Sequence, residues 1–200
     1  MATTCRCVGF ARLIALVLGC VFLFGCASAD HAYFVKTKTD ANVYVAPRRS
    51  RPKNIKKVAI MPFKAPTELI GASVSDMFVT EMLRAGRYEL VERSQMARVL
   101  SEAELAMAGL SASRAVEVGN MVGADAVVIG TVDEYGTVAN RGRTYPVVGI
   151  NARLIDCESG KIIWSVDLAE RSSSSSDTLP QHARATVHEM MAALYKKWLD

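Results

Sequence analysis

The sequence has little excess of charge of either sign. Its 200 residues include 24 Lys and Arg and 20 Asp and Glu, which gives a formal net charge of +4. Residues 1–25 contain Arg6 and Arg12 and no acidic residue, so the remainder has 22 basic and 20 acidic residues. A balance this close to neutral is unlike that of proteins that bind polyanions, and we expect no nucleic-acid partner.

The sequence also lacks an apolar run long enough for a membrane-spanning helix. The longest run, from Leu13 to Phe24, has about a dozen residues, whereas a spanning helix needs about 20. Arg6 and Arg12 precede this run. A basic segment followed by a short apolar segment is typical of a secretory signal peptide. We therefore expect a signal peptide at the start of the sequence.

The apolar run ends in Leu23-Phe24-Gly25-Cys26. This tetrapeptide resembles the lipobox of bacterial lipoproteins, in which the cysteine thiol receives a diacylglyceryl group and the new amino terminus is acylated after cleavage. The resemblance implies that residues 1–25 are a signal peptide cleaved between Gly25 and Cys26. It also implies that Cys26 is the lipidation site and that lipid chains anchor the protein to a membrane. Val17-Leu18-Gly19-Cys20 is a weaker site because little apolar sequence precedes it. An ordinary signal peptide or anchor with incidental cysteines is the other alternative.

Cysteine is scarce beyond the predicted anchor. Of the five cysteines, only Cys157 follows Cys26. The mature chain therefore has no pair for an internal disulfide, although an extracytoplasmic compartment would permit one. We expect Cys157 to be a small apolar residue in a turn or at a strand end. An intermolecular or reactive thiol is the alternative.

Residues 26–54 are polar and lack helical periodicity. We expect a lipidated N-terminus and a flexible tether here, with a possible short edge strand at Val43-Tyr44-Val45. The end of this segment is basic, and its charge has two interpretations: contact with anionic lipid headgroups or wall polymer, or a solvated linker. The residues concerned are Arg48, Arg49, Arg51, Lys53, Lys56 and Lys57.

Residues 55–200 have the pattern of one α/β domain with a mixed sheet flanked by helices. Short apolar runs predict buried strands at Val58–Met61, Tyr88–Val91 and Ala126–Ile129. Apolar residues at helical spacing predict helices over Ile70–Met82, Met96–Met107 and Ala115–Val122. Gly86 is expected to end the first of these helices, and Ser94 is a plausible N-cap of the second.

The second half of the domain has the pattern of an antiparallel meander and a closing helix. Strands are predicted from Val147 to Ile155 and from Lys161 to Ala169, joined by a turn at Glu158-Ser159-Gly160. Residues 139–143 have the composition of an earlier hairpin tip. Ser172 to Ser176 predicts a flexible loop, and Thr178-x-x-Gln181 predicts a capping box. The closing helix has its apolar face at Ala183, Val187, Met190, Met191, Leu194 and Trp198.

Patterns of catalytic and metal-binding residues are also lacking. The three histidines are His31, His182 and His188. The last two are six positions apart and do not share a helix face for a metal. The segment 188–192 has Ala192 where a zincin motif needs its second histidine, and no Gly-x-Ser-x-Gly elbow occurs. We therefore predict no catalytic, cofactor-binding or metal-binding residue, no cofactor, and a protein that is not an enzyme.

Four segments in sequence order are similar to segments of the CsgG family, the lipoproteins of the curli secretion channel. They are residues 58–63, 88–94 with 99–102, 123–130, and 148–156 with 159–162. The resemblance implies a periplasmic domain of CsgG type over most of the chain. It also implies that Gly123 and Asp125 shape the entry to a central strand. Glu92 and Arg93 would pair locally or across a subunit contact.

Channel-forming members of this family insert two long amphipathic hairpins into the membrane, and each strand of such a hairpin needs about 9–11 residues. In this sequence the interval 135–148 contains Arg141 and Arg143, and the interval 169–179 is mostly serine and charged residues. Neither interval can present an apolar band to lipid. We therefore expect a CsgG-like protein that lacks the transmembrane hairpins and forms no pore.

Two functions are compatible with these features. The first is a lipid-anchored accessory or assembly protein of CsgG type at the periplasmic face of the outer membrane. It would act by homo-oligomerisation or by docking a periplasmic protein partner. Ala27, which follows the predicted lipidated cysteine, favours the outer membrane because it is not the aspartate that retains enterobacterial lipoproteins in the inner membrane. The alternative is a lipoprotein regulatory module that activates a peptidoglycan synthase.

Overall fold

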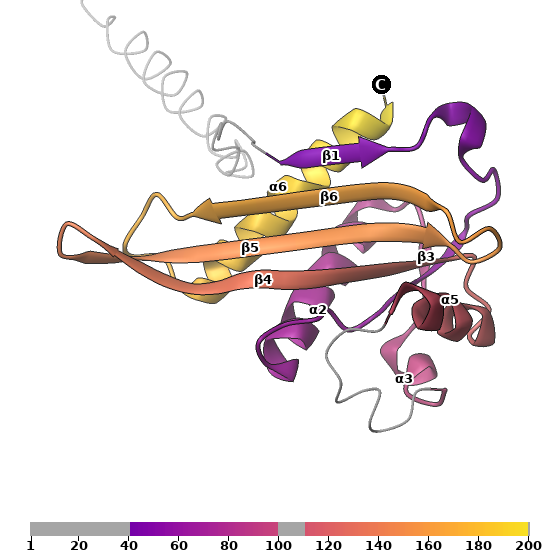
Figure 1. Ribbon diagram of the computed structural model, residues 1–200, viewed down its shortest axis with the longest axis horizontal. Coiled ribbons are helices and arrows are strands. Elements are labelled where there is room, and N and C mark those ends of the chain that lie inside the picture. The colour runs from indigo at the N-terminus through magenta and orange to yellow at the C-terminus, as the bar shows by residue number, and fades with distance from the viewer. Residues whose placement is uncertain (1–40, 100–110, 200) are drawn as a thin grey trace, which may run out of the picture. The chain divides into compact units, whose positions relative to one another are not determined.

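One six-stranded mixed sheet, with the strand order β1-β6-β5-β4-β2-β3, organises the domain (Figure 1). The structure, a computed structural model, describes residues 41–99 and 111–199. β2 runs parallel to β3 and β4, and the other pairs are antiparallel. The strands are β1 (Asn42–Val45), β2 (Lys57–Ile60), β3 (Glu89–Leu90), β4 (Ala126–Asn140), β5 (Arg143–Asp156) and β6 (Ile162–Arg171). The predicted mixed α/β fold is confirmed.

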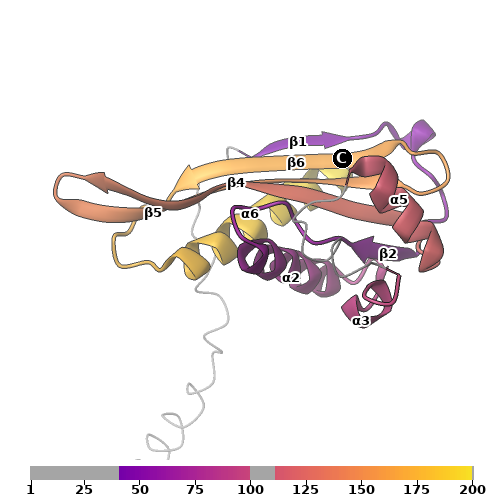
Figure 2. The ribbon, with the colours of Figure 1, turned by 60° about the horizontal axis from the view of Figure 1, so that its bottom comes forward.

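The helices cover the two faces of the sheet unequally. α2 (Glu68–Ala85) and α6 (Leu179–Leu199) pack on one face, and α5 (Ala112–Met121) packs on the other face near the start of β4 (Figure 2). A short helix, α3 (Arg93–Met96), follows β3, and the 3-10 turn η1 (Arg48–Ser50) follows β1. Among the described residues, no helix combines the length and apolar character needed to span a bilayer.

α2 ends and α6 begins where the sequence predicts, and α2 begins at Glu68, two residues before the predicted Ile70. In α2, the Thr67 hydroxyl accepts a hydrogen bond from the amide of Ile70 at 3.3 Å, and Gly86 adopts φ 62° beyond the last turn. At the start of α6, the amide of Thr178 donates to Gln181 Oε1 at 2.9 Å, and the amide of Gln181 donates to Thr178 Oγ1 at 3.4 Å. The predicted capping box is therefore confirmed, and it satisfies amides that have no partner within the helix.

The main core lies between the sheet and the α2–α6 layer. Trp164 and Phe63 are buried at its centre, and the ring centroids of Phe63 and Phe78 lie 5.0 Å apart. The predicted apolar face of α6 faces this core. A second, smaller core forms between α5 and the opposite face of the sheet. It contains Ala115, Val118, Val127, Ile129, Ile155 and Cys157.

The structure corrects three local predictions. Ser94 is not the N-cap of the helix after β3, because α3 begins at Arg93 with Glu92 at the N-cap position. The rest of that predicted helix lies partly outside the described residues. The serine loop before α6 is hydrogen-bonded rather than free: the Ser172 hydroxyl donates to Asp177, and the Ser172 amide donates to the carbonyl of Pro146 at 2.8 Å.

The third correction concerns the strand predicted at Val147 to Ile155, which begins earlier, at Arg143. β4 and β5 therefore form one long hairpin whose turn lies at Arg141 and Gly142, with φ 50° and 74°. β5 pairs with β6 only from Val147 onward, so the residues of β5 that precede Val147 have no partner on β6. We call residues 135–146 the arm. In Figure 1 the arm extends past the ends of the neighbouring strands, so its two strands pair only with each other.

Candidate functional site

The predicted lipidation and cleavage site at Gly25 and Cys26 lies outside the described residues. It therefore stays a prediction. The candidate features of the described domain are polar contacts between elements and one open sheet face. Each of them can stabilise the fold as well as serve a function.

Two arginines of the basic segment cap the end of α6. Arg48 Nη2 donates to the carbonyl of Leu199 at 2.8 Å, and Arg51 Nη1 donates to the carbonyl of Trp198 at 3.3 Å. The Arg51 guanidinium also lies 4.4 Å from the Trp198 ring centroid. The last carbonyls of a helix lack intrahelical partners and carry partial negative charge, so cations are favoured there. These two arginines are therefore attached to the folded domain rather than part of a solvated linker.

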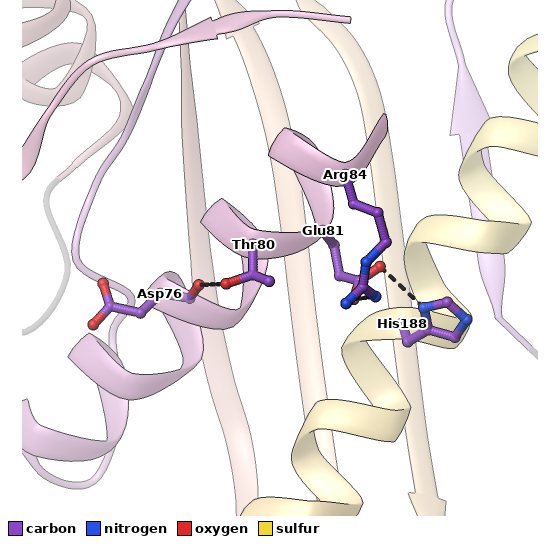
Figure 3. Close-up of polar contacts among 5 residues, drawn as sticks. All are labelled: Asp76, Thr80, Glu81, Arg84 and His188. Carbon is purple, nitrogen blue, oxygen red and sulfur yellow. Dashed lines mark hydrogen bonds and ion pairs between the residues drawn. The ribbon is translucent and has the colours of Figure 1, made fainter. Parts of the chain in front are cut away.

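A polar contact joins α2 to α6 (Figure 3). The Glu81 carboxylate lies 2.5 Å from Arg84 Nη1 and 3.0 Å from His188 Nδ1, and its side chain is only 9% exposed. An open depression of about 250 Å³ adjoins this contact, lined by Ser73, Asp76, Met77, Thr80, Glu81, Arg84 and Arg184. Because Glu81 on α2 already contacts Arg84 and reaches His188 on α6, the geometry is that of a contact that joins the two helices.

The two described histidines serve separate contacts. His182 is buried, and its Nε2 lies 3.1 Å from the carbonyl oxygen of Glu170 on β6. His188 reaches α2 instead, through Glu81. Within residues 41–99 and 111–199, no group of three His, Cys, Asp or Glu side chains is placed to hold a metal ion.

Asp125 organises the entry to β4, as the family resemblance implies. Its Oδ2 accepts hydrogen bonds from the amides of Lys56 and Lys57, both at 2.8 Å. These backbone hydrogen bonds hold the pKa of Asp125 below its ordinary value, and the bond from Lys57 has the larger effect. Gly123, at φ 67°, supplies the left-handed turn before it. Asp125 therefore ties the start of β2 to the start of β4.

Glu92 and Arg93 do not form a contact with each other that the structure records. Arg93 Nη1 lies 3.4 Å from the Asp76 carboxylate on α2, so Arg93 pairs within the domain. A groove of about 100 Å³ runs beside this pair, between α2, β3 and α3. Its apolar lining includes Val79, Leu83 and Met96.

Cys157 is a buried residue just after β5, as predicted. Burial, followed by the nearby charges of Asp156 and Asp125, raises the pKa of its thiol to about 11. A thiol with so high a pKa holds almost no thiolate at neutral pH, and the thiolate is the reactive form. Cys157 is therefore a packing residue opposite α5, where it lies against Gly119.

The face of the sheet opposite α2 and α6 is open beyond the part that α5 covers. In β5, residues 148, 150, 152 and 154 are buried under the helices, so residues 145, 147, 149, 151 and 153 point the other way. In β6, residues 165, 167, 169 and 171 share this orientation. We call the surface that these nine residues form the outer face. Figure 1 shows the strands in front of α6, with this face toward the viewer.

The outer face contains polar contacts that follow the strand register. Asn42 Nδ2 donates to Asp167 Oδ1 at 3.1 Å, across the β1–β6 pair. Asn151 Nδ2 donates to Asp133 Oδ2 at 2.8 Å and to Thr131 Oγ1 at 2.5 Å. Further toward the arm, the Arg171 guanidinium lies 5.0 Å from the Tyr145 ring centroid. The strand register brings these side chains together, and the sequence alone does not show which of them meet.

The comparison with known families gives one match. The family described as "Curli production assembly/transport component CsgG" matches residues 48–184. This range covers more than half of the chain and includes every described element from η1 to the first turns of α6. No curated protein matches the sequence.

Solved structures with a similar fold include two bacterial proteins. The PelC dodecamer from Paraburkholderia phytofirmans has a TM-score of 0.53 and 19% identity, over 76% of this chain and 94% of that chain. Lipoprotein GNA1162 from Neisseria meningitidis has a TM-score of 0.52 and 19% identity, over 72% of this chain and 98% of that chain. At these identities the likeness shows a shared fold.

Proposed function

Because this chain belongs to the CsgG family, we propose that it is a lipid-anchored accessory or assembly protein at the periplasmic face of the outer membrane. It acts by assembling with copies of itself or by docking a periplasmic protein, and it forms no pore. The observation that carries this proposal is the family match over residues 48–184, which follows a lipobox-like segment ending at Cys26.

Membrane attachment in this proposal comes from lipid on Cys26. Each buried methylene of an acyl chain contributes about 0.8 kcal/mol, and stable anchoring takes at least two chains. Residues 26–40 then link the anchor to β1, which begins at Asn42. This link is shorter than a tether that continues to residue 54, because β1 pairs with β6 and η1 lies against the end of α6.

The contacts near the two intervals that hold membrane hairpins in channel-forming relatives support a protein without a pore. The arm ends in Arg141 and Arg143, two cations that would have to enter or cross the apolar layer. The segment between β6 and α6 is a short loop held by Ser172, whose hydroxyl also accepts a hydrogen bond from the amide of Ser174 at 3.0 Å. Neither segment has 9–11 residues of alternating apolar character per strand.

Self-assembly is supported by the fold. The solved PelC structure with this fold is described as a dodecamer. We propose that the present protein also forms a homo-oligomer, with the lipid anchor holding all copies on one leaflet. Confinement to a surface raises the effective concentration of the domains, so even a weak contact can assemble them.

Cell fractionation tests the anchor. The wild-type protein should sediment with the outer membrane and resist a high-salt wash, and Cys26→Ala should release a folded domain. Cys20→Ala is the matched control, because it removes the competing cysteine and leaves the segment ending at Cys26 intact. Retention of Cys26→Ala in washed membranes would show that the anchor is elsewhere or that Cys20 is the lipidated residue.

Native mass and electron microscopy in detergent test the mode of action. A ring or other assembly of many copies supports the assembly proposal, and a strict monomer contradicts it. Co-purification of the monomer with a peptidoglycan synthase would instead favour the regulatory module. Reproducible conductance of pure protein in liposomes would show that the no-pore proposal is wrong.

A further inference from the structure

The tip of the arm has positive charge and no negative charge beside it. Arg141 and Arg143 are both exposed, and within residues 41–99 and 111–199 neither has a hydrogen bond or an ion pair. None of the residues of the arm, 135–146, is acidic. Both guanidinium groups are therefore available to an anionic partner from outside the domain.

The acidic side chains closest to the arm along β4 and β6 lie at its base. Glu134 faces Gly149 and Glu170 faces Val148, in the rows just before the arm begins. From Val148 to the turn at Arg141 the hairpin is about 20 Å long. The Debye length at physiological ionic strength is about 8 Å, so the carboxylates at the base are screened from the tip.

The first residue of β1 lies at the end of that strand that is nearer to the arm. β1 runs antiparallel to β6, so that Asn42 pairs with Asp167 and Val45 pairs with Trp164. β6 then continues from Asp167 to Arg171, at the base of the arm. Figure 1 shows β1 beginning on the side toward which the arm extends. The link from the predicted anchor therefore joins the sheet at its arm-facing end.

The length of this link exceeds the length by which the arm extends beyond β1. Asn42, Asp167 and Asn151 form one row across three strands. Arg143 precedes Asn151 by eight residues of β5. These eight residues have a length of about 27 Å. The 15 residues from 26 to 40 reach at most about 50 Å. A lipid on Cys26 therefore keeps the tip of the arm within reach of the membrane surface.

We propose that the tip of the arm binds the anionic phospholipid headgroups of the membrane that holds the lipid anchor. Arginine donates paired hydrogen bonds to phosphate oxygens, and its charge is favoured at an anionic surface. The charges of Arg141 and Arg143 oppose insertion into the apolar layer, so the arm rests on the surface. Tyr145, opposite the exposed Val138, adds an aromatic ring of the type enriched at membrane interfaces.

This inference rests on the proposed function, because it names a second membrane contact of the same anchored protein. Two arginines alone bind an anionic surface weakly, and the anchor supplies the high local concentration that makes the contact form. Two attachments at the same end of the sheet then fix the orientation of the domain, with the arm toward the membrane and the turn at residues 157–160 away from it.

Fluorescence quenching in vesicles tests the contact. The full lipidated protein, with a fluorophore on Asn140→Cys beside the tip, is reconstituted into vesicles of phosphatidylcholine and phosphatidylglycerol. A nitroxide on the lipid headgroups should quench this label, and a nitroxide deep in the acyl chains should not. The matched control is Glu158→Cys, an exposed position in the turn at the other end of β5. Cys157 is buried and does not compete for the fluorophore.

Charge reversal tests the role of the two arginines. Arg141→Glu/Arg143→Glu should lower the headgroup quenching by about fivefold, because the attraction to the anionic surface becomes a repulsion. Arg141→Lys/Arg143→Lys keeps the charge and should keep most of the quenching. Lys161→Glu/Lys197→Glu reverses two exposed charges away from the arm and should have no effect.

Two measurements on the labelled protein with both arginines intact keep the test independent of any loss of fold. High salt should lower the quenching because it shortens the screening length. Vesicles of phosphatidylcholine alone should give as little quenching as the reversed variant. Quenching that ignores salt, lipid charge and charge reversal would overturn the proposal.

Three other outcomes would also overturn the proposal. Equal quenching of the labels at 140 and 158 would show no preferred orientation. Strong quenching from the acyl chains would place the arm inside the apolar layer. A label at 140 that neither the lipid quenchers nor aqueous iodide can reach would show that protein, such as a second copy, covers the arm. Flotation of the same proteins with the vesicles reports on the anchor, so the proposed function is judged separately.

Discussion

The two faces of β5 and β6 differ in what their residues do, although they belong to the same strands. On the helix side, Trp164 and Leu154 are buried against α2 and α6. On the other side, Arg153 and Asp167 are exposed to solvent. Burial of large apolar side chains provides most of the stability of a domain, whereas exposed charges contribute little to it. One face therefore holds the fold together, and the other is free to carry interactions.

The largest expected effect is on the helix-side face. Trp164→Ala should lower the free energy of unfolding by about 3–5 kcal/mol, because it removes a large buried side chain and leaves a cavity. Ser165→Ala, one residue along on the outer face, should change it by less than about 0.5 kcal/mol. Denaturant unfolding of the purified protein measures both values. Similar losses for the two variants would break the distinction between the faces.

Two glycines of β4 sharpen the comparison, because one supports the main core and the other lies in the arm. A Cβ at Gly130 would lie 2.4 Å from the Phe63 ring and 2.5 Å from the carbonyl oxygen of Asn151. Gly130→Ala should therefore destabilise the domain by about 1–3 kcal/mol. A Cβ at Gly136 meets nothing within 4 Å, so Gly136→Ala is the matched control. Thermal unfolding should show a clear loss for the first variant alone.

Substitution of Asp125 tests the polar contact that joins the starts of β2 and β4. Its folded pKa is below its ordinary value, so its charge stabilises the fold above that ordinary value, and the contribution is lost as the pH falls through the lowered pKa. Asp125→Asn should therefore cost up to about 1 kcal/mol at neutral pH, since solvent weakens the contact. The gap from wild type should close in acid. Glu158→Gln, in the nearby turn, should show no such pH dependence; a gap that persists in acid would refute the charge argument.

The smallest effect on stability is expected on the outer face. Arg171→Asp removes the contact with Tyr145, worth about 0.5–1 kcal/mol at an exposed site. A loss of several kcal/mol would mean that Arg171 contributes more to the fold than this one contact. Denaturant unfolding of the variant and of the wild type measures the difference.

Much of the secondary structure could be predicted because its determinants are local. The apolar spacing of α2 and α6, the stop at Gly86 and the capping box at Thr178 and Gln181 are all confirmed. Each depends on residues within a turn or two of one another. The prediction of Ser94 as an N-cap was wrong, because serine is common outside N-cap positions. The N-cap of α3 is Glu92.

The long-range contacts could not be predicted from spacing. Asn42 bonds Asp167 across 125 positions, Glu81 meets His188 across 107, and Arg48 reaches Leu199 across 151. No periodicity connects such residues, because they come together only when β1 pairs with β6 and α2 packs beside α6. The basic segment illustrates this. Its charges can be read from the sequence, but the sequence does not show that Arg48 and Arg51 bind the carbonyls at the end of α6.

The sequence alone determined the class of the protein. The alternating and helical patterns predicted the mixed α/β domain, and four short segments predicted the CsgG family that the family match confirms. The lipid anchor at Cys26 is still predicted from sequence alone. The tertiary structure decided which residues share a face and at what register. Strand pairing places Arg171 of β6 beside Val147 of β5, and the contact of Arg171 with Tyr145 exists only once the two strands are aligned.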